Sequence, residues 1–183
     1  MPNFATGFRG TAHGAVQTAY TDQPGVGYPG MQAYASDNIL HDAMFIGEAD
    51  GIAAGKGVAF TNLTEAAHNL QRPNKSANLP TVASTAEDFA GVLMFDEAMQ
   101  SDENGVPGWA KGRVGRIARP HRSGSRLYVK ARENIELTDT VNWVTVAPVD
   151  GSYEVGEFAP AALGGGAAGT SVALNGCRWE TEA

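Results

Sequence analysis

The alternation of apolar and polar residues is clearest between residues 125 and 132. Three apolar positions, Leu127, Val129 and Ala131, are separated by residues that are polar or charged. A period of two predicts a β-strand with one buried face, and here the opposite face carries cations. This stretch therefore predicts the first strand of a sheet.

Two further strands are expected directly after it, which makes the region a β-meander. Residues 141–146 (VNWVTV) are apolar on both faces and rich in β-branched and aromatic side chains, which predicts a strand covered on both sides. The Asp150-Gly151 pair favours a tight reversal, because glycine adopts positive φ without a steric penalty. The chain then enters a third predicted strand at residues 153–158.

The remaining predicted elements are short strands and very little helix. Compact apolar runs predict strands at residues 43–46, 57–60, 89–95 and 171–179. Asn62 followed by Glu65 has the spacing of a capping box and predicts two helical turns before Pro73. Residues 72–80 are expected to form a polar loop. The 23 glycines, 9 prolines and 18% charged residues also favour an all-β fold with at most one or two short helices.

Residues 1–38 differ from the rest of the chain because neither periodicity is sustained there. We expect them to form an extended N-terminal arm, and residues 39–183 to form a single domain. The arm is dense in turn-forming glycine and proline at residues 23–30. A flexible tail is the alternative. Aromatic side chains that the arm cannot bury locally are candidates for docking on the domain or on a neighbouring molecule: Phe4, Phe8 and Tyr28.

Charge is distributed unevenly along the chain. The net charge is −7, from 20 acidic and 13 basic residues, yet residues 104–132 contain no acidic residue and eight basic ones. This basic stripe is a candidate contact surface for an acidic partner, either a protein or a nucleic acid. The alternative is that its side chains pair with acidic neighbours in the same molecule. Its members are Lys111, Arg113, Arg116, Arg119, Arg122, Arg126, Lys130 and Arg132.

Four arginines of the basic stripe recur at every third residue from 113 to 122. Gly112, Gly115 and Pro120 argue against a helix, so a bulged strand or an extended polyproline-like ribbon is expected. Exposed edge strands often carry cations that prevent unwanted pairing. We therefore expect residues 111–122 at the edge of a sheet.

The sequence contains no constellation with catalytic spacing, so no enzyme activity, cofactor or metal site is expected. Residues 50–57 (DGIAAGKG) resemble a phosphate-binding loop, but the first glycine is one position late and Gly57 replaces the Ser or Thr that holds magnesium. Residues 164–169 satisfy G-x-G-x-x-G without a surrounding βαβ pattern, and are expected to form a flexible loop. The four histidines are far apart. The single cysteine, Cys177, is expected to be an unreactive thiol.

The N-terminal residues lack the apolar core of a signal peptide. No stretch approaches the roughly 18 apolar residues needed for a membrane span. The expectation is a soluble protein made in the cytoplasm.

Several short motifs occur in an order that resembles the cement, or decoration, proteins of tailed-bacteriophage heads. They are Gly-Tyr-Pro-Gly at 27–30, Phe-Ala-Gly-Val at 89–92, Arg-Leu-Tyr-Val-Lys-Ala at 126–131, and a Gly/Ala-rich loop before a final short strand. The resemblance covers most of the chain, and the arginine-rich segment 111–122 departs from it. It implies a jelly-roll-like antiparallel β-sandwich with an extended N-terminal arm.

The resemblance also implies a role and partners. A cement protein forms homodimers or homotrimers and sits on the capsid exterior, where it clamps adjacent subunits of the major capsid protein. Such a protein is made in the host cytoplasm, has no membrane partner and is not expected to bind nucleic acid directly. The arm would reach across a subunit boundary, and the basic stripe would meet acidic capsid loops.

Three other functions remain open from the sequence. A glycan- or receptor-binding β module would use Trp109, Trp143 and Trp179 to stack on sugars. A small jelly-roll enzyme would assemble its site from residues distant in sequence. A nucleic-acid binder would use the basic stripe, although the net charge opposes that function.

Overall fold

The computed structural model describes residues 29–32, 41–62, 75–96, 99–101, 107–119, 126–130 and 132–180. Within these ranges the regular elements are strands, apart from two 3₁₀ turns, η2 (Ala86–Asp88) and η3 (Gly166–Ala168). The expected all-β class is confirmed. This part of the chain contains no helix with the length and apolar character that crossing a membrane requires.

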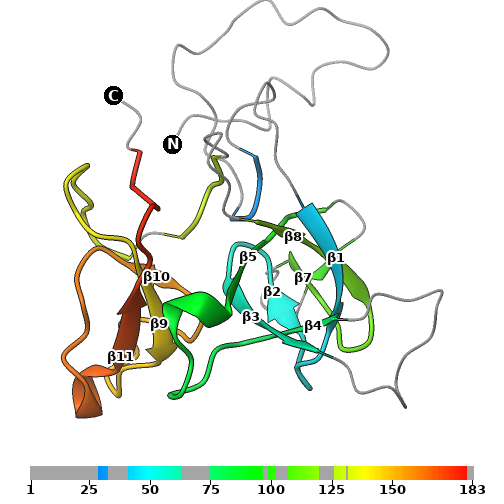
Figure 1. Cartoon of the computed structure of the whole chain (residues 1–183), viewed down its shortest axis with the longest axis horizontal. Coiled ribbons are helices and arrows are strands. Elements are labelled where there is room, and N and C mark those ends of the chain that lie inside the picture. The colour runs from blue at the N-terminus through cyan, green and yellow to red at the C-terminus, as the bar shows by residue number, and fades with distance from the viewer. Residues whose placement is uncertain are drawn as a thin grey trace, which may run out of the picture.

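Five strands close into a small barrel (Figure 1). In barrel order they are β1 (His41–Ile46), β4 (Lys75–Asn78), β3 (Gly57–Asn62), β5 (Phe89–Leu93) and β8 (Val114–Ala118). All neighbouring pairs are antiparallel except β1 and β4, which run parallel. Each barrel strand is hydrogen-bonded on both sides, so closure removes the exposed strand edges.

The barrel interior holds the main hydrophobic core. Met44 and Ile46 of β1, Val58 of β3, Leu93 of β5 and Ile117 of β8 are at most 1% exposed. Burying one such side chain contributes roughly 1.5–3 kcal/mol before the entropy cost of ordering it. The apolar runs that predicted β1, β3 and β5 therefore also supply side chains that fill the barrel.

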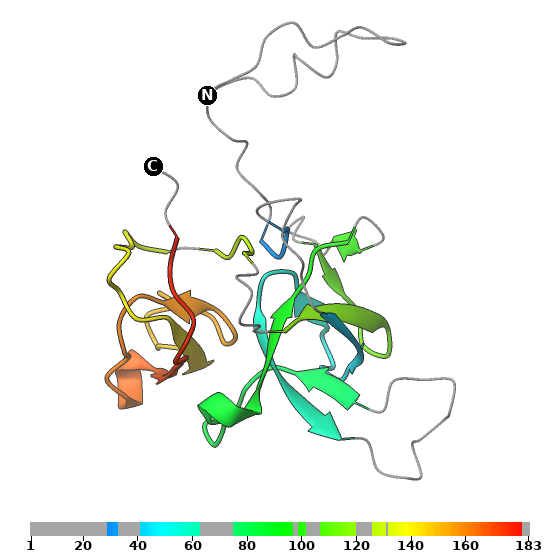
Figure 2. The ribbon, with the colours of Figure 1, turned by 45° about the horizontal axis from the view of Figure 1, so that its top comes forward.

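A second sheet lies beside the barrel (Figures 1 and 2). It consists of β10 (Phe158–Ala159), β9 (Asn142–Val146) and β11 (Thr170–Ala173), with β9 in the centre and antiparallel to both neighbours. β9 is buried along most of its length, as its apolar composition predicts. A third sheet contains the short strands β2 (Ile52–Ala53), β7 (Pro107–Trp109) and β6 (Gln100–Ser101).

An aromatic cluster joins the barrel to the β9 sheet. Trp143 of β9 is fully buried and meets the Phe89 ring of β5 edge-on, with 5.0 Å between the ring centroids. The Phe158 ring of β10 meets the same phenylalanine at 6.2 Å. Ala59 and Val92 extend the cluster on the barrel side. The outer surface of β3 and β5 is therefore covered by the β9 sheet.

The strand predicted at residues 125–132 is wrong. The described part of this stretch makes one isolated bridge, Leu127 with Gln32, instead of a ladder. Val129 packs against the aromatic cluster, whereas Lys130 pairs with a carboxylate. In the described residues, Val129 toward the core and Lys130 and Arg132 toward carboxylates account for the alternation, without a strand ladder.

The predicted β-meander is also wrong in part, in the residues that follow β9. The reversal at Asp150-Gly151 is confirmed, with Gly151 at φ +71. Residues 153–157 contain a turn instead of a strand, because Gly156 adopts φ +86 and the Glu157 amide donates to the Glu154 carbonyl. β9 consequently pairs with the two-residue β10 and with β11.

The expected edge position of residues 111–122 is also wrong. β8 lies between β1 and β5 in the closed barrel. Gly115, which argued against a helix, faces the core, where a Cβ would lie 2.9 Å from the Leu93 side chain. This glycine is thus required by close packing and does not break the strand.

Other predictions have mixed outcomes. The strands at 43–46, 57–60 and 89–95 are confirmed, and the final strand is shortened to β11. Part of the expected loop at 72–80 is β4, since Ser76 and Ala77 are buried in spite of their polar neighbours. The closed barrel, with its one parallel pair, replaces the expected jelly-roll-like antiparallel sandwich.

Several predictions fall outside the described residues. They include the helix expected between Asn62 and Pro73, and the N-terminal arm apart from residues 29–32. The boundary between an arm at 1–38 and a domain at 39–183 stays a prediction.

Candidate functional site

The basic stripe is divided between two places in the fold. Lys111, Arg113, Arg116 and Arg119 lie in β8 and the residues that flank it, on the barrel. Arg126, Lys130 and Arg132 lie in an irregular segment, residues 126–132 without the undescribed Ala131, which we call the strap. The remaining candidates are outside the described residues: Arg122, Phe4, Phe8 and Tyr28.

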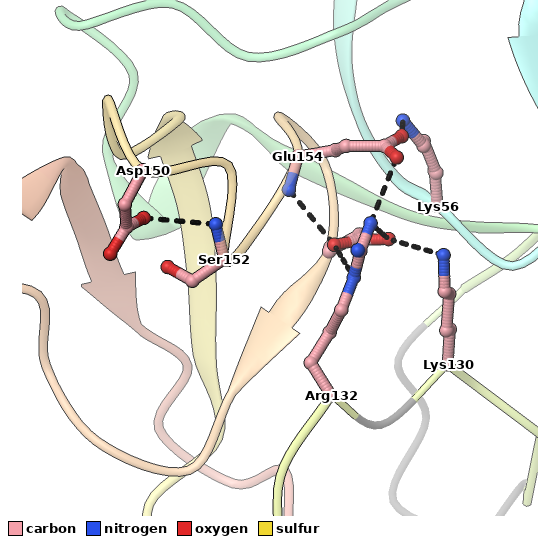
Figure 3. A network of polar contacts seen from close by, with 7 residues as sticks. Lys56, Lys130, Arg132, Asp150, Ser152 and Glu154 are labelled. Carbon is pink, nitrogen blue, oxygen red and sulfur yellow. Dashed lines mark hydrogen bonds and ion pairs between the residues drawn. The ribbon is translucent and has the colours of Figure 1, made fainter.

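The strap is held by a network of ion pairs (Figure 3). Arg132 makes a bidentate pair with Glu157, its Nε 2.9 Å from Oε2 and its Nη2 2.8 Å from Oε1. Lys130 Nζ lies 3.5 Å from the same Oε1. Arg132 also donates to Glu154 at 2.8 Å, and Lys56 donates to the other oxygen of Glu154 at 2.7 Å. One network therefore joins the strap, the turn before β10 and the turn before β3.

Burial makes this network structurally important. Glu157 is 4% exposed, so its carboxylate is stabilised by the guanidinium and by the Glu154 amide, which donates at 2.8 Å. The hydrogen bond to Glu157 raises the pKa of Arg132, and the hydrogen bond from Lys56 lowers the pKa of Glu154. Both groups are thus held in their charged forms. Such groups stabilise structure and are poorly suited to proton transfer near neutral pH.

A tyrosine extends the network toward the other side of the strap. The Tyr153 hydroxyl donates to the Glu133 carboxylate. Burial, followed by this hydrogen bond, raises the pKa of Tyr153. The phenol consequently remains protonated and acts as a donor.

The strap also contacts the described end of the N-terminal segment. The Gly30 amide donates to the Tyr128 carbonyl at 2.7 Å, and the Tyr128 amide donates to the Met31 carbonyl at 2.9 Å. On its other side the Gly30 carbonyl accepts from the Phe95 amide at 3.0 Å. Gly30 has φ +84, and a Cβ there would lie 2.6 Å from the Leu93 carbonyl oxygen. Only glycine fits this position, which fixes the segment between the strap and the end of β5.

The barrel part of the basic stripe faces outward. Because Gly115 and Ile117 point into the core, Val114 and Arg116 project from the outer wall of β8, and both are exposed. Ala43 lies opposite Arg116 in the strand register and is also exposed. We call the exposed residues of β8, of its flanking residues and of the Ala43 position opposite it the β8 face: Ala43, Lys111, Arg113, Val114, Arg116 and Arg119.

A comparison with protein-family models gives one match, to the structural cement protein family (E217 gp24/Pam3 gp6), over residues 16–183. The chain belongs to this family of phage structural cement proteins. The resemblance expected from the sequence motifs is confirmed, and the chain is a structural protein of a bacteriophage virion. Neither the curated proteins nor the solved structures gave a match to the chain.

The structure shows what the family-like motifs of this cement protein do in the fold. In Phe-Ala-Gly-Val, Gly91 has φ +143, and a Cβ there would lie 2.0 Å from the Ala118 carbonyl oxygen of β8. This glycine allows β5 and β8 to close the barrel. Arg-Leu-Tyr-Val-Lys-Ala is the strap sequence, and the last glycine of Gly-Tyr-Pro-Gly is the Gly30 that the strap holds.

The two glycine-rich stretches of the cement protein have structural roles. In the phosphate-loop-like stretch, Gly55 has φ +82, and a Cβ there would lie 2.4 Å from Pro29. The 164–169 loop contains η3, and its Gly165 amide donates to the Gly169 carbonyl. Among the described residues no group of three or more His, Cys, Asp or Glu side chains is arranged to hold a metal. Burial raises the pKa of Cys177, which keeps its thiol protonated.

Sequence reasoning missed the acidic half of the strap network. Glu154 and Glu157 were assigned to a strand, and Lys56 was considered only as part of a stretch that resembles a phosphate-binding loop. One signal was available: Glu157 is followed by Phe158 and Ala159 in a run otherwise suited to burial. A buried carboxylate requires a cationic partner, and the basic stripe is the nearest cluster of cations in the sequence.

Proposed function

We propose that this protein binds the outer surface of the assembled phage head and stabilises contacts between subunits of the major capsid protein. The observation that carries the proposal is the family match, which spans residues 16–183. The role is structural and requires no chemical reaction. Its partners are the major capsid protein and further copies of itself, as a homodimer or homotrimer, with no membrane or direct nucleic-acid partner.

Binding alone accounts for stabilisation in this proposal. A protein that binds the assembled lattice more tightly than the separated subunits shifts the equilibrium toward the lattice by mass action. Weak contacts that symmetry repeats over the shell add up through multivalency. The N-terminal arm would contribute a contact across a subunit boundary, and its attachment at Gly30 gives it a fixed starting point on the barrel.

No observation favours the glycan-binding alternative. Trp143 is fully buried and Trp179 is 8% exposed, so these two rings are covered by the protein's own side chains. Trp109 is only partly exposed and packs against the barrel core. Stacking on a sugar requires an exposed aromatic ring face. The three tryptophans do not form such a surface.

The proposal is tested with heads assembled without the protein. Purified protein is added, and its occupancy is measured by co-sedimentation and by imaging of the heads. Saturable binding to the exterior, with a higher temperature of head rupture, is the expected result. If the protein fails to sediment with heads, or binds them without changing their rupture temperature, the proposed function is wrong.

A further inference from the structure

The β8 face combines an aliphatic centre with surrounding cations. Val114 is 41% exposed on the outer wall of the barrel, where its register partner on β1 is Phe45, and the next outward-facing pair is Arg116 with Ala43. Lys111 and Arg113 are exposed in the turn that leads into β8. In Figure 1, β1 lies on the side of the barrel away from the β9 sheet, and β8 lies between β1 and β5.

The described acidic groups near this face leave an excess of positive charge. Asp42 of β1 pairs with Arg119, with 3.3 Å between Oδ2 and Nε. Asp50 is exposed in the next turn, which approaches the chain at Trp109. Within the described part of the chain, no ion pair involves Lys111 or Arg113. In a protein of net charge −7, this concentration of cations is unusual.

Each strap cation is paired within the molecule, as Arg119 is on the β8 face, whereas no ion pair in the described part of the chain involves Lys111 or Arg113. Arg126 lies 2.7 Å from Glu180, and Lys130 and Arg132 both pair with Glu157. Their charges are already used to hold the strap against the domain. The two parts of the basic stripe thus have separate roles, and the part suited to an outside partner is the one on β8.

The face is also rigid. β8 is hydrogen-bonded to β1 along five registered residue pairs and to β5 on its other side. A surface whose backbone is already ordered loses little entropy when it binds. Arginine around a small aliphatic centre is typical of protein interfaces, because guanidinium groups form bidentate pairs with carboxylates while the centre excludes water.

We infer that the β8 face is the surface that binds the major capsid protein, and that it recognises an acidic patch with a small apolar centre. This inference rests on the proposed function and names its contact surface. The partner is a protein because aliphatic residues lie among the arginines and because the net charge of −7 opposes nucleic acid. A second copy of the chain is the competing occupant.

The experiment compares single charge reversals on two faces. Arg113→Glu and Arg116→Glu change the β8 face, and Arg178→Glu makes the same charge change at an exposed arginine of the C-terminal segment. Arg113→Gln and Arg116→Gln are milder forms in case a reversal impairs folding, which thermal denaturation would show. Affinity for heads that lack the protein is measured by co-sedimentation at several salt concentrations. The oligomeric state of each free variant is measured by analytical ultracentrifugation.

The expected result is a loss of affinity of roughly tenfold or more for each β8-face reversal, a smaller salt dependence, and wild-type binding by Arg178→Glu. If the wild type binds heads and all variants match it, the β8 face is not the contact. The inference is then wrong, while the proposed function stands. If the β8-face variants change the oligomeric state but not head binding, a second copy occupies the face and the inference is wrong. If the wild type does not bind heads, the proposed function fails as well.

Discussion

Gly57 of β3 packs against the indole of Trp143 so closely that a Cβ at position 57 would lie 2.7 Å from the indole Nε1. The same Cβ would lie 2.9 Å from the rings of Phe158 and Phe89. A barrel glycine thus provides the space in which the β9 sheet docks. The closeness of the two sheets depends on a residue that the sequence placed at the end of the phosphate-loop-like stretch and at the start of a predicted strand.

Replacing this glycine tests the importance of the contact. Gly57→Ala is expected to lower the free energy of unfolding by about 1–3 kcal/mol, because the added methyl group overpacks three aromatic rings. Urea denaturation followed by tryptophan fluorescence measures the change. The control is Gly164→Ala, where a Cβ would meet no atom within 4 Å and the effect should stay within about 0.5 kcal/mol. Equal effects of the two substitutions would contradict the proposed packing role.

Gly91 should tolerate substitution even less than Gly57. Its φ of +143 is unfavourable for L-residues with a side chain, and an added Cβ would lie 2.0 Å from the Ala118 carbonyl oxygen. The obstacle is backbone of β8, which cannot move aside as a flexible side chain could. Gly91→Ala is expected to cost at least about 3 kcal/mol or to prevent folding. A stable variant with wild-type circular dichroism and urea midpoint would show that the barrel does not need this close approach.

The Glu157 carboxylate should contribute more stability than an exposed ion pair. Glu157→Gln removes the charge that Arg132 and Lys130 approach, and it leaves the guanidinium poorly compensated. Breaking a buried pair from one side typically costs about 3–5 kcal/mol, and the partial exposure of Arg132 places our expectation at about 3 kcal/mol.

The matched control is the exposed pair of Arg178 and Glu180, 2.8 Å apart. Arg178→Gln should change the free energy of unfolding by less than about 1 kcal/mol, because solvent screens exposed charges. Limited proteolysis at the strap provides a second measurement. If Glu157→Gln is as stable and as protease-resistant as the wild type, the strap is held by other contacts.

The sequence predicts best where burial alone determines the structure. The β9 strand and the barrel strands β1, β3 and β5 follow from apolar runs, since those side chains are buried whatever surrounds them. The strap was mistaken for a strand because its structure depends on partners distant in sequence, Glu154 and Glu157. Alternation is compatible with both a ladder and a row of ion pairs, and only the three-dimensional positions of the acids decide between them.

The candidate surface was predictable only in part, for a related reason. The excess of cations in the basic stripe is visible in the sequence, but its division between the strap and the β8 face is not. Barrel closure gives β8 neighbours on both sides and turns Arg116 outward. The family motifs identified the class of protein because they mark sites of close backbone approach, such as Gly30 and Gly91.

Acid should weaken the strap network. The pKa of Glu154 is below its usual value of 4.5 in the folded protein, chiefly because Lys56 donates a hydrogen bond to it. Its contribution to stability is therefore fully present above the unfolded pKa and is lost as the pH falls through the folded pKa. Urea midpoints measured from pH 7 down to pH 3 should decline below about pH 4.5. Glu154→Gln should make this decline shallower, and an identical decline in the variant would exclude a role for this carboxyl group.

Alkaline solution should act through Tyr153. Burial and the hydrogen bond to Glu133 raise the pKa of this phenol above its usual value of 10.0, so the folded protein holds the proton more tightly than the unfolded chain. The stabilisation is fully present below the unfolded pKa and is lost as the pH rises through the folded pKa. Stability should thus begin to fall above about pH 10. Tyr153→Phe cannot ionise, and should be less stable than the wild type at pH 7 yet change less between pH 9 and pH 11. Parallel pH profiles for the two proteins would mean that another group causes the alkaline loss.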